Sequence, residues 1–301
     1  MENMTKGRFD KAIRKNVVEK DGEEKLGYVI EGKEPYTDYY SREEFKVFVD
    51  EMESKYNEIF KKYDKCVGKE MIEKDGVPPK MASVASSSRF CYLALRDGAQ
   101  ALGIGSKIEF EHKCKITGIK SPTHPQLDAY IEESNTYIEV KCHEIFDTHA
   151  DIVMSKQYEE YICDMFKVQK EKYIEGDKLV IPISEFGIKK KSNSKTDRTR
   201  FDVKQLLCHL FGVKSEMGKE KFQEATLMYL FFWPKSDAPE EEKQINEVFK
   251  ELKEEIDILF KKGPIREYAD KNNIKLKAYA QHSKVMEGIK EYNIKDLMEN
   301  E

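Results

Sequence analysis

The chain has 301 residues, of which 39% are hydrophobic and 36% charged, and its mean hydropathy is −0.71. This balance is typical of a globular protein with a sizeable core, in one large or two small domains, and it excludes a collagen-like or globally disordered chain. The net charge of −5 gives no global sign of nucleic-acid binding, although local basic patches decide such contacts.

Helical spacing dominates the early part of the chain. A capping box at Ser41 and Glu44 predicts the start of a helix. Its apolar positions follow at helical spacing, which indicates core packing. They are Phe45, Phe48, Met52, Tyr56, Ile59 and Phe60. A second helix is predicted over 84–102, with Gly103 as its stop signal.

Strand signals follow. Apolar and charged residues alternate over 107–116, and two more strand-like runs, 126–131 and 136–142, are joined by a polar turn. The remaining predicted elements are a helix over 154–170, an extended segment over 178–183, a helix over 201–211 with Asp202 as N-cap and Gly212 as stop, a buried strand over 225–233, an amphipathic helix over 240–261 and a candidate edge strand over 274–280. The order helix, three strands, helix, strand predicts a mixed α/β sheet.

No run approaches the roughly 18 apolar residues of a membrane span, and the first 20 residues lack the apolar core of a secretion signal. The six cysteines contain no C-x-x-C pair. Free thiols in a reducing compartment are therefore favoured over disulfides or a structural zinc site. We expect a cytoplasmic protein without a membrane partner.

Several familiar motifs fail on inspection. Gly27–Lys33 has the spacing of a phosphate-binding P-loop, but Glu34 replaces the hydroxyl residue and Pro35 follows where a helix should begin. His143 and His149 are six residues apart, which does not match the H-E-x-x-H zinc motif. There is no G-x-S-x-G, so a serine hydrolase has no support.

The remaining candidate motif is a pair of carboxylates followed by a lysine. The tripeptide E-x-K is common in this Lys/Glu-rich chain, but on a strand its two charged side chains share one face. Glu139–Lys141 is the extended example with a suitable partner. The even length of the preceding turn sets Asp128 opposite Glu139 on the same face of an antiparallel pair.

Two carboxylates one strand apart can hold Mg²⁺, which prefers oxygen ligands. Such a metal polarises a phosphodiester, and a neighbouring lysine can orient the attacking water. An exposed salt bridge is the alternative. The neighbours Tyr137, Ile138, Val140 and Cys142 instead indicate a buried strand, where unpaired charges are costly.

The segment Ser121 to Glu144, SPTHPQLDAYIEESNTYIEVKCHE, resembles the PD-(D/E)XK nuclease superfamily, which has the restriction-endonuclease-like fold. The resemblance implies a nuclease core over 81–233 with an insertion at 143–200. A mostly helical flank, 1–80, would precede this core, and a helical extension with a candidate edge strand, 234–301, would follow it.

The same resemblance implies that Asp128 and Glu139 bind Mg²⁺, or Mn²⁺ in its place, with the backbone carbonyl of Val140 as a further ligand. It assigns Lys141 to the attacking water. The proline of the motif name is displaced, since Leu127 precedes Asp128 and Pro125 lies three residues before it. That proline carries no chemistry.

Further candidates are weaker. Glu111 could supply an extra acid from the first strand, or could be an exposed strand glutamate. Gln205 and His209 share one face of the helix over 201–211, and such nucleases often draw polar groups from this helix. Alternatively, Gln157 and Tyr161 fit the Q-x-x-x-Y pattern of the RecB-like branch. For each of these four, a plain helix-surface residue is the favoured interpretation.

A basic stretch lies within 187–204. It holds seven positive residues against Asp197 and Asp202, in an otherwise acidic chain. These are Lys189, Lys190, Lys191, Lys195, Arg198, Arg200 and Lys204. We expect a loop that follows DNA phosphates and orders on binding, the alternative being a solvated loop.

The sequence therefore predicts a Mg²⁺-dependent DNA endonuclease, of the type II-like restriction kind, acting on double-stranded DNA. The resemblance implies a homodimer, since double-strand cleavage needs two sites, and a cognate methyltransferase could belong to the same system. The alternatives are a repair, junction-resolving or mobile-element nuclease, or an inactive member that only binds DNA or a protein.

Overall fold

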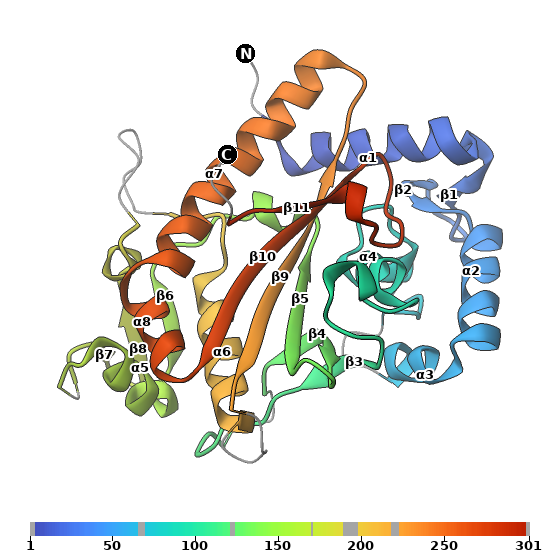
Figure 1. The fold of residues 1–301 in the computed structure, drawn as a ribbon. Helices are drawn as coiled ribbons and strands as arrows, with labels where there is room; N and C mark the ends of the chain where they lie inside the picture. Colours follow the sequence, from blue (N-terminus) through green and yellow to red (C-terminus); the bar gives the residue numbers. More distant parts are fainter. Residues whose placement is uncertain are drawn as a thin grey trace.

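The computed structural model describes residues 4–65, 70–120, 124–169, 171–188, 198–217 and 223–298. Its centre is a six-stranded mixed sheet in the order β11-β10-β9-β5-β4-β3 (Figure 1). The strands are β3 (Ile108–Lys113), β4 (Gln126–Ile131), β5 (Thr136–Lys141), β9 (Ala225–Pro234), β10 (Ile274–Ser283) and β11 (Ile294–Asp296). The predicted mixed α/β class is confirmed.

Strand β5 divides the sheet into two halves. On one side β3, β4 and β5 pair antiparallel, and on the other β5, β9 and β10 pair parallel. A tight turn with Asn135 at φ 46° joins β4 to β5. Parallel neighbours need long crossovers, which the helical segments supply. The predicted edge position of 274–280 is wrong, because β10 lies between β9 and β11.

Helices cover both faces of the sheet (Figure 1). Their bounds are α1 (Lys6–Asp21), α2 (Arg42–Lys55), α3 (Asn57–Lys65), α4 (Ser87–Leu95), α5 (Glu159–Phe166), α6 (Val203–Met217), α7 (Pro239–Lys261) and α8 (Gly263–Lys271). Phe90 of α4 packs on Phe232 of β9, with ring centroids 5.3 Å apart. Trp233, the next residue, stacks on Phe249 of α7. Successive residues of β9 thus meet opposite layers, which explains its continuous apolar run.

Helix α1 crosses one end of this sheet. The Asn16 side-chain amide donates to the carbonyls of Lys235 and Lys284, directly after β9 and β10. Asp10 lies 2.9 Å from the Nδ1 of His143, two residues after β5. The helix therefore packs where the parallel strands end, the edge at which open α/β sheets bind their ligands.

Several predicted bounds differ from the structure. The helix expected over 154–170 is replaced by β6 (Ile152–Ser155) and the shorter α5, because Ile152 and Met154 are buried while Val153 and Ser155 are exposed. Strand β6 joins β8 (Lys178–Ile181) and β7 (Ile174–Glu175) in a small sheet. Another small sheet pairs β1 (Leu26–Tyr28) with β2 (Tyr36–Tyr40).

Helix boundaries were predicted with mixed success. Ser41 caps α2 as expected, by accepting the Glu44 N–H, and Asp202 accepts the Gln205 N–H before α6. The predicted stop at Gly212 is wrong, because α6 continues to Met217. A Cβ on Gly212 would lie 2.7 Å from the Cβ of Cys114. This glycine therefore allows a close approach rather than ending the helix.

The division into 1–80, 81–233 and 234–301 stays a prediction. Strands β10 and β11 of the last segment complete the same sheet as β9. Among the described residues, no helix combines the length and apolar character that crossing a membrane requires.

Candidate active site

The paired carboxylates lie where the β4–β5 hairpin opens. The ladder runs from Ile131 opposite Thr136 to Ala129 opposite Ile138, so the same register puts Asp128 across from Glu139. There the Asp128 carboxylate replaces the next ladder bond and accepts the backbone N–H of Val140 at 2.7 Å. The even turn length thus gives the arrangement expected from the sequence.

Glu139 is the centre of a buried polar network. Its Oε1 accepts from the Nζ of Lys141 at 2.7 Å and from the side-chain amide of Gln205 at 2.8 Å. Its Oε2 lies 3.8 Å from the Nε2 of His209, whose Nδ1 lies 3.1 Å from the hydroxyl of Tyr229. The Glu139 side chain is 5% exposed and that of Lys141 15%. Helix α6 therefore encloses these charges against the sheet.

The rival helical pair lies elsewhere. Gln157 accepts the backbone N–H of Lys120 at 2.7 Å, and Tyr161 donates to the carbonyl of Thr117 at 2.8 Å. Both side chains join the insertion to the loop after β3. The structure thus brings Gln205 and His209, not Gln157 and Tyr161, to Glu139.

Glu111 is a third acid next to the pair. Its backbone has φ 56°, in the left-handed region that costs a non-glycine residue about 1–3 kcal/mol. The side chain accepts from the Gln126 amide. The negative charges of Glu70 and Glu139 add to the effect of burial and raise the pKa of Glu111. Glu70, buried and paired with Lys80 at 3.0 Å, was not identified from the sequence, since no strand or motif marks it.

The site has an excess of negative charge. Burial, reinforced by Glu139 and Glu111, raises the pKa of Asp128 well above its usual value. Burial, with the charges of Glu70 and Glu139, raises the pKa of Glu111 to about 7. Burial alone would lower the pKa of Lys141, but Glu139, Glu144 and Asp128 raise it above its usual value. One ammonium therefore faces several crowded carboxylates.

Glu144 is the other acid that sequence reasoning missed. It follows β5 and accepts the backbone N–H of Cys142 at 2.7 Å. Burial alone would raise its pKa, but Lys141 and the Cys142 N–H hold the pKa below its usual value. In the local sequence, His143 and Glu144 belong only to a zinc motif whose spacing does not match. The turn that brings Glu144 back toward Lys141 depends on the tertiary structure, so the local sequence does not predict it.

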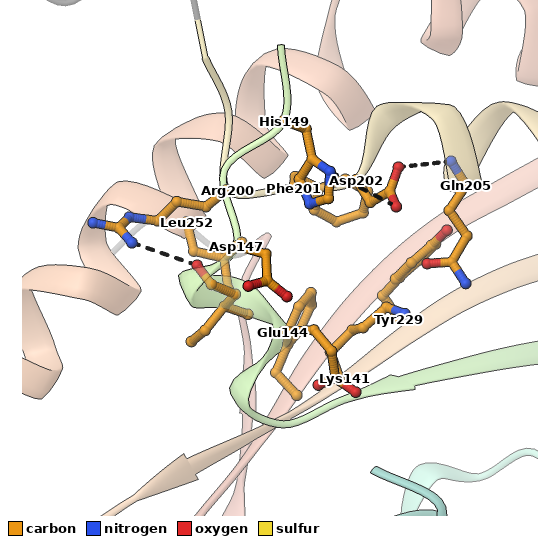
Figure 2. A pocket seen from close by; sticks show the side chains of 12 residues that line it. Lys141, Glu144, Asp147, His149, Arg200, Phe201, Asp202, Gln205, Tyr229 and Leu252 are labelled. Atoms are coloured by element: carbon orange, nitrogen blue, oxygen red, sulfur yellow. Dashed lines mark hydrogen bonds and ion pairs between the residues drawn. The ribbon is translucent and has the colours of Figure 1, made fainter. Parts of the chain in front are cut away.

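A cavity of about 140 Å³ opens beside Lys141. Figure 2 shows Lys141 and Glu144 at one end and His149 and Asp202 across from them, with Tyr229 and Gln205 along one side. A second hollow of about 250 Å³ is lined by Glu70, Lys80, His143, Glu144 and the serines at the start of α4. The buried lysine therefore lines a cavity that combines charged and apolar side chains.

The basic stretch is described only in part. Lys189, Lys190, Lys191 and Lys195 lie outside the described residues. Arg198 donates to the hydroxyl of Thr148 at 3.2 Å. Arg200 pairs with Glu251 at 2.7 Å and lines the cavity. The predicted contact of Arg200 with DNA stays a prediction, and the side chain would make it from a position beside Glu251.

The donor set fits a hard divalent cation. Asp128, Glu139 and Glu111 supply carboxylate oxygens within one buried patch, and the raised pKa values of Asp128 and Glu111 mark a deficit of positive charge. Mg²⁺ is bound in proteins through a few carboxylates together with water. Comparison of the chain with protein-family models, with curated proteins and with solved structures finds no match.

Proposed function

We propose that this protein is a metal-dependent DNA endonuclease with the restriction-endonuclease-like arrangement of its core. The observation that carries the proposal is the convergence of Asp128, Glu139 and Lys141 on one buried face at the open end of a hairpin. The element order α4, β3, β4, β5, α6, β9 supports it, since that is the helix, three strands, helix, strand order of the fold that the sequence resembles.

In this proposal Asp128 and Glu139 hold Mg²⁺, with Glu111 and the Val140 carbonyl as further oxygen donors. The bound ion supplies Lewis acidity toward the phosphodiester and its attacking water. The acidic side chains that line the cavity are consistent with a requirement for a bound cation. Glu144, Asp147 and Asp202 would otherwise oppose a phosphate beside Lys141 and Arg200.

Lys141 acts as a hydrogen-bond donor. In the metal-free chain, burial alone would lower the pKa of Lys141, but Glu139, Glu144 and Asp128 raise it, so the side chain is an ammonium there. From its place beside Glu139 it can orient the attacking water and stabilise the negative charge that develops on the phosphoryl oxygens. Gln205 and His209 position Glu139 from the other side.

The test is cleavage of supercoiled plasmid DNA with Mg²⁺, with and without a chelator. We expect Asp128→Asn and Lys141→Ala to lose roughly 10²–10³-fold in rate. The matched controls are Asp177→Asn and Lys178→Ala, which alter an exposed aspartate and lysine at the start of β8. Folded D128N and K141A proteins that cut as fast as the parent would overturn the proposal, as would cleavage that ignores the chelator.

The finer proposal is a type II-like restriction enzyme that works as a homodimer. Discrete fragments from a defined DNA, and an assembly of two copies on that DNA, are the expected results. Cutting confined to branched or damaged DNA would instead favour the repair or junction-resolving alternative. A gene for a methyltransferase next to this one would support restriction.

A further inference from the structure

A second polar cluster lies under the far end of α6, away from the carboxylates. It contains His112 at the end of β3, Cys114 just after that strand and Glu216 in the last turn of α6. The Nε2 of His112 lies 2.9 Å and the Sγ of Cys114 3.7 Å from the same oxygen of Glu216. All three potential ligand atoms lie within 4.8 Å of one another.

We propose that His112, Cys114 and Glu216 form a zinc site. Tetrahedral Zn²⁺, with bonds of about 2.0–2.3 Å, separates its donor atoms by roughly 3.3–3.6 Å. The separations of 2.9 and 3.7 Å from Glu216 bracket this range, and all three atoms lie within 4.8 Å of one another, so the three side chains can reach a single ion after a local rearrangement. Nitrogen, sulfur and oxygen together select zinc over the hard Mg²⁺. Three protein ligands leave the fourth position for water.

The surroundings are those of a metal site. The Nδ1 of His112, the nitrogen that faces away from the cluster, lies 3.0 Å from Glu109. A carboxylate behind a ligating histidine fixes its orientation and raises its basicity. The Tyr137 hydroxyl donates to Glu216 at 3.3 Å and holds that carboxylate in place. Cys114 is fully buried, and the other two side chains are 15% and 17% exposed.

Two backbone features bring the ligands together. Gly212 lies one helical turn before Glu216, and its missing Cβ lets α6 approach Cys114. On the strand, the left-handed backbone of Glu111 interrupts the alternation. His112 pairs in register with Leu127, yet its ring stacks on Tyr130 at 4.6 Å. The left-handed backbone at Glu111 therefore places the imidazole of His112 on the face of the sheet that α6 covers.

The competing explanation is a charged histidine held between Glu109 and Glu216. In the metal-free chain both ring nitrogens contact carboxylates, which requires both to donate. Zinc would displace the Nε2 proton and the thiol proton and so release two protons. Zinc binding and a simple ion pair can therefore be distinguished by the number of metal ions held per chain, by the pH dependence of metal binding and by the absorption spectrum.

The experiment uses the full chain without a histidine tag. We expect elemental analysis of the purified protein to find about one zinc per chain, because three protein ligands and a water complete one tetrahedral site. After chelation, Co²⁺ should produce an intense near-ultraviolet thiolate-to-metal band. Cys114→Ser should abolish that band, and Glu216→Gln should weaken Co²⁺ binding. Cys163→Ser, which alters a cysteine that is only partly buried, should change neither.

Glu109→Gln is the second variant, since it leaves every proposed ligand in place. It should weaken metal affinity roughly 10–100-fold. Asp128→Asn should keep the cobalt band whatever its effect on DNA cleavage, so this proposal and the proposed function fail independently. A Co²⁺ complex without a thiolate band, or a band that persists in folded C114S, would overturn the zinc site.

Discussion

Two polar clusters lie on the same face of the sheet, under opposite ends of α6, and their charge balance differs. At the carboxylate site, formed by Asp128, Glu139, Lys141 and Glu111, acids outnumber bases and two pKa values are raised. At Glu216 the pKa shift has the opposite direction. Burial alone would raise its pKa, but His112 and the surrounding donors keep the pKa below its usual value.

This difference in charge balance distinguishes two roles of a buried carboxylate. A carboxylate that accepts from several donors stabilises the fold, whereas crowded carboxylates destabilise it until a cation arrives. Burial is similar in the two places, with side-chain exposures of 5% for Glu139 and 17% for Glu216. Burial contributes most to the raised pKa values of Asp128 and Glu111, and neighbouring carboxylates add to it, whereas the donors around Glu216 outweigh its burial. The carboxylate site is therefore the one suited to bind a divalent cation through oxygen alone.

The largest expected effect is the loss of cleavage in Glu139→Gln. The amide keeps the shape of the side chain but removes the charge that pairs with Lys141 and that the proposed function assigns to the metal. We expect a fall of roughly 10²–10³-fold in the single-turnover rate with Mg²⁺. Glu216→Gln, assayed in parallel, should retain most of the cleavage rate. Equal losses in the two variants would remove the distinction between the clusters.

The second effect is a pH dependence of stability in the metal-free protein. Because the folded pKa of Glu111 is about 7 instead of 4.5, the folded state holds a proton that the unfolded state has lost. Stability is then highest below pH 4.5 for this group and falls by about 3 kcal/mol as the pH rises through 7.

Urea unfolding in chelator, at pH 5, 6, 7 and 8, measures this dependence. Glu111→Gln should flatten the profile and be more stable than the parent at pH 8. Mg²⁺ should also flatten it in the parent. If the parent gains stability between pH 5 and 8 and the variant follows it, the assignment of Glu111 is wrong.

The third effect concerns positioning. Gln205→Ala removes the 2.8 Å bond to Glu139, and we expect cleavage to slow roughly 10–100-fold with little change in DNA affinity. Gln157→Ala is the matched control, since its side chain contacts the Lys120 backbone instead. Similar rates for the two variants would show that Gln205 does not position the acid.

The smallest effect is on stability at the compensated cluster. In the metal-free protein, Glu216→Gln weakens its bonds from His112 and Tyr137, so we expect a loss of about 1–3 kcal/mol in unfolding free energy at pH 7 in the presence of a chelator. Glu175→Gln, at an exposed position on β7, should change it by less than about 0.5 kcal/mol. A Glu216→Gln protein as stable as this control would mean that its donors are not stabilising.

The sequence by itself determined the local elements and the pairing that matters most. Period-two alternation predicted a strand at β3, although the left-handed backbone of Glu111 interrupts that alternation. The even turn between β4 and β5 predicted the register that sets Asp128 opposite Glu139. Helical spacing identified Gln205 and His209 as one of two candidate pairs, and the contact with Glu139 decided between them. These are short-range properties, which one stretch of chain carries.

Only the tertiary structure decided the rest. Nothing local links Glu70 or Glu144 to the site, and Gly212 looks like a helix stop until Cys114 is seen against it. Strand β10 carries an edge-like alternation but lies inside the sheet because β11 covers it. Likewise, Cys114 and Glu216 are 102 residues apart in the chain, so only folding brings the thiol to the carboxylate.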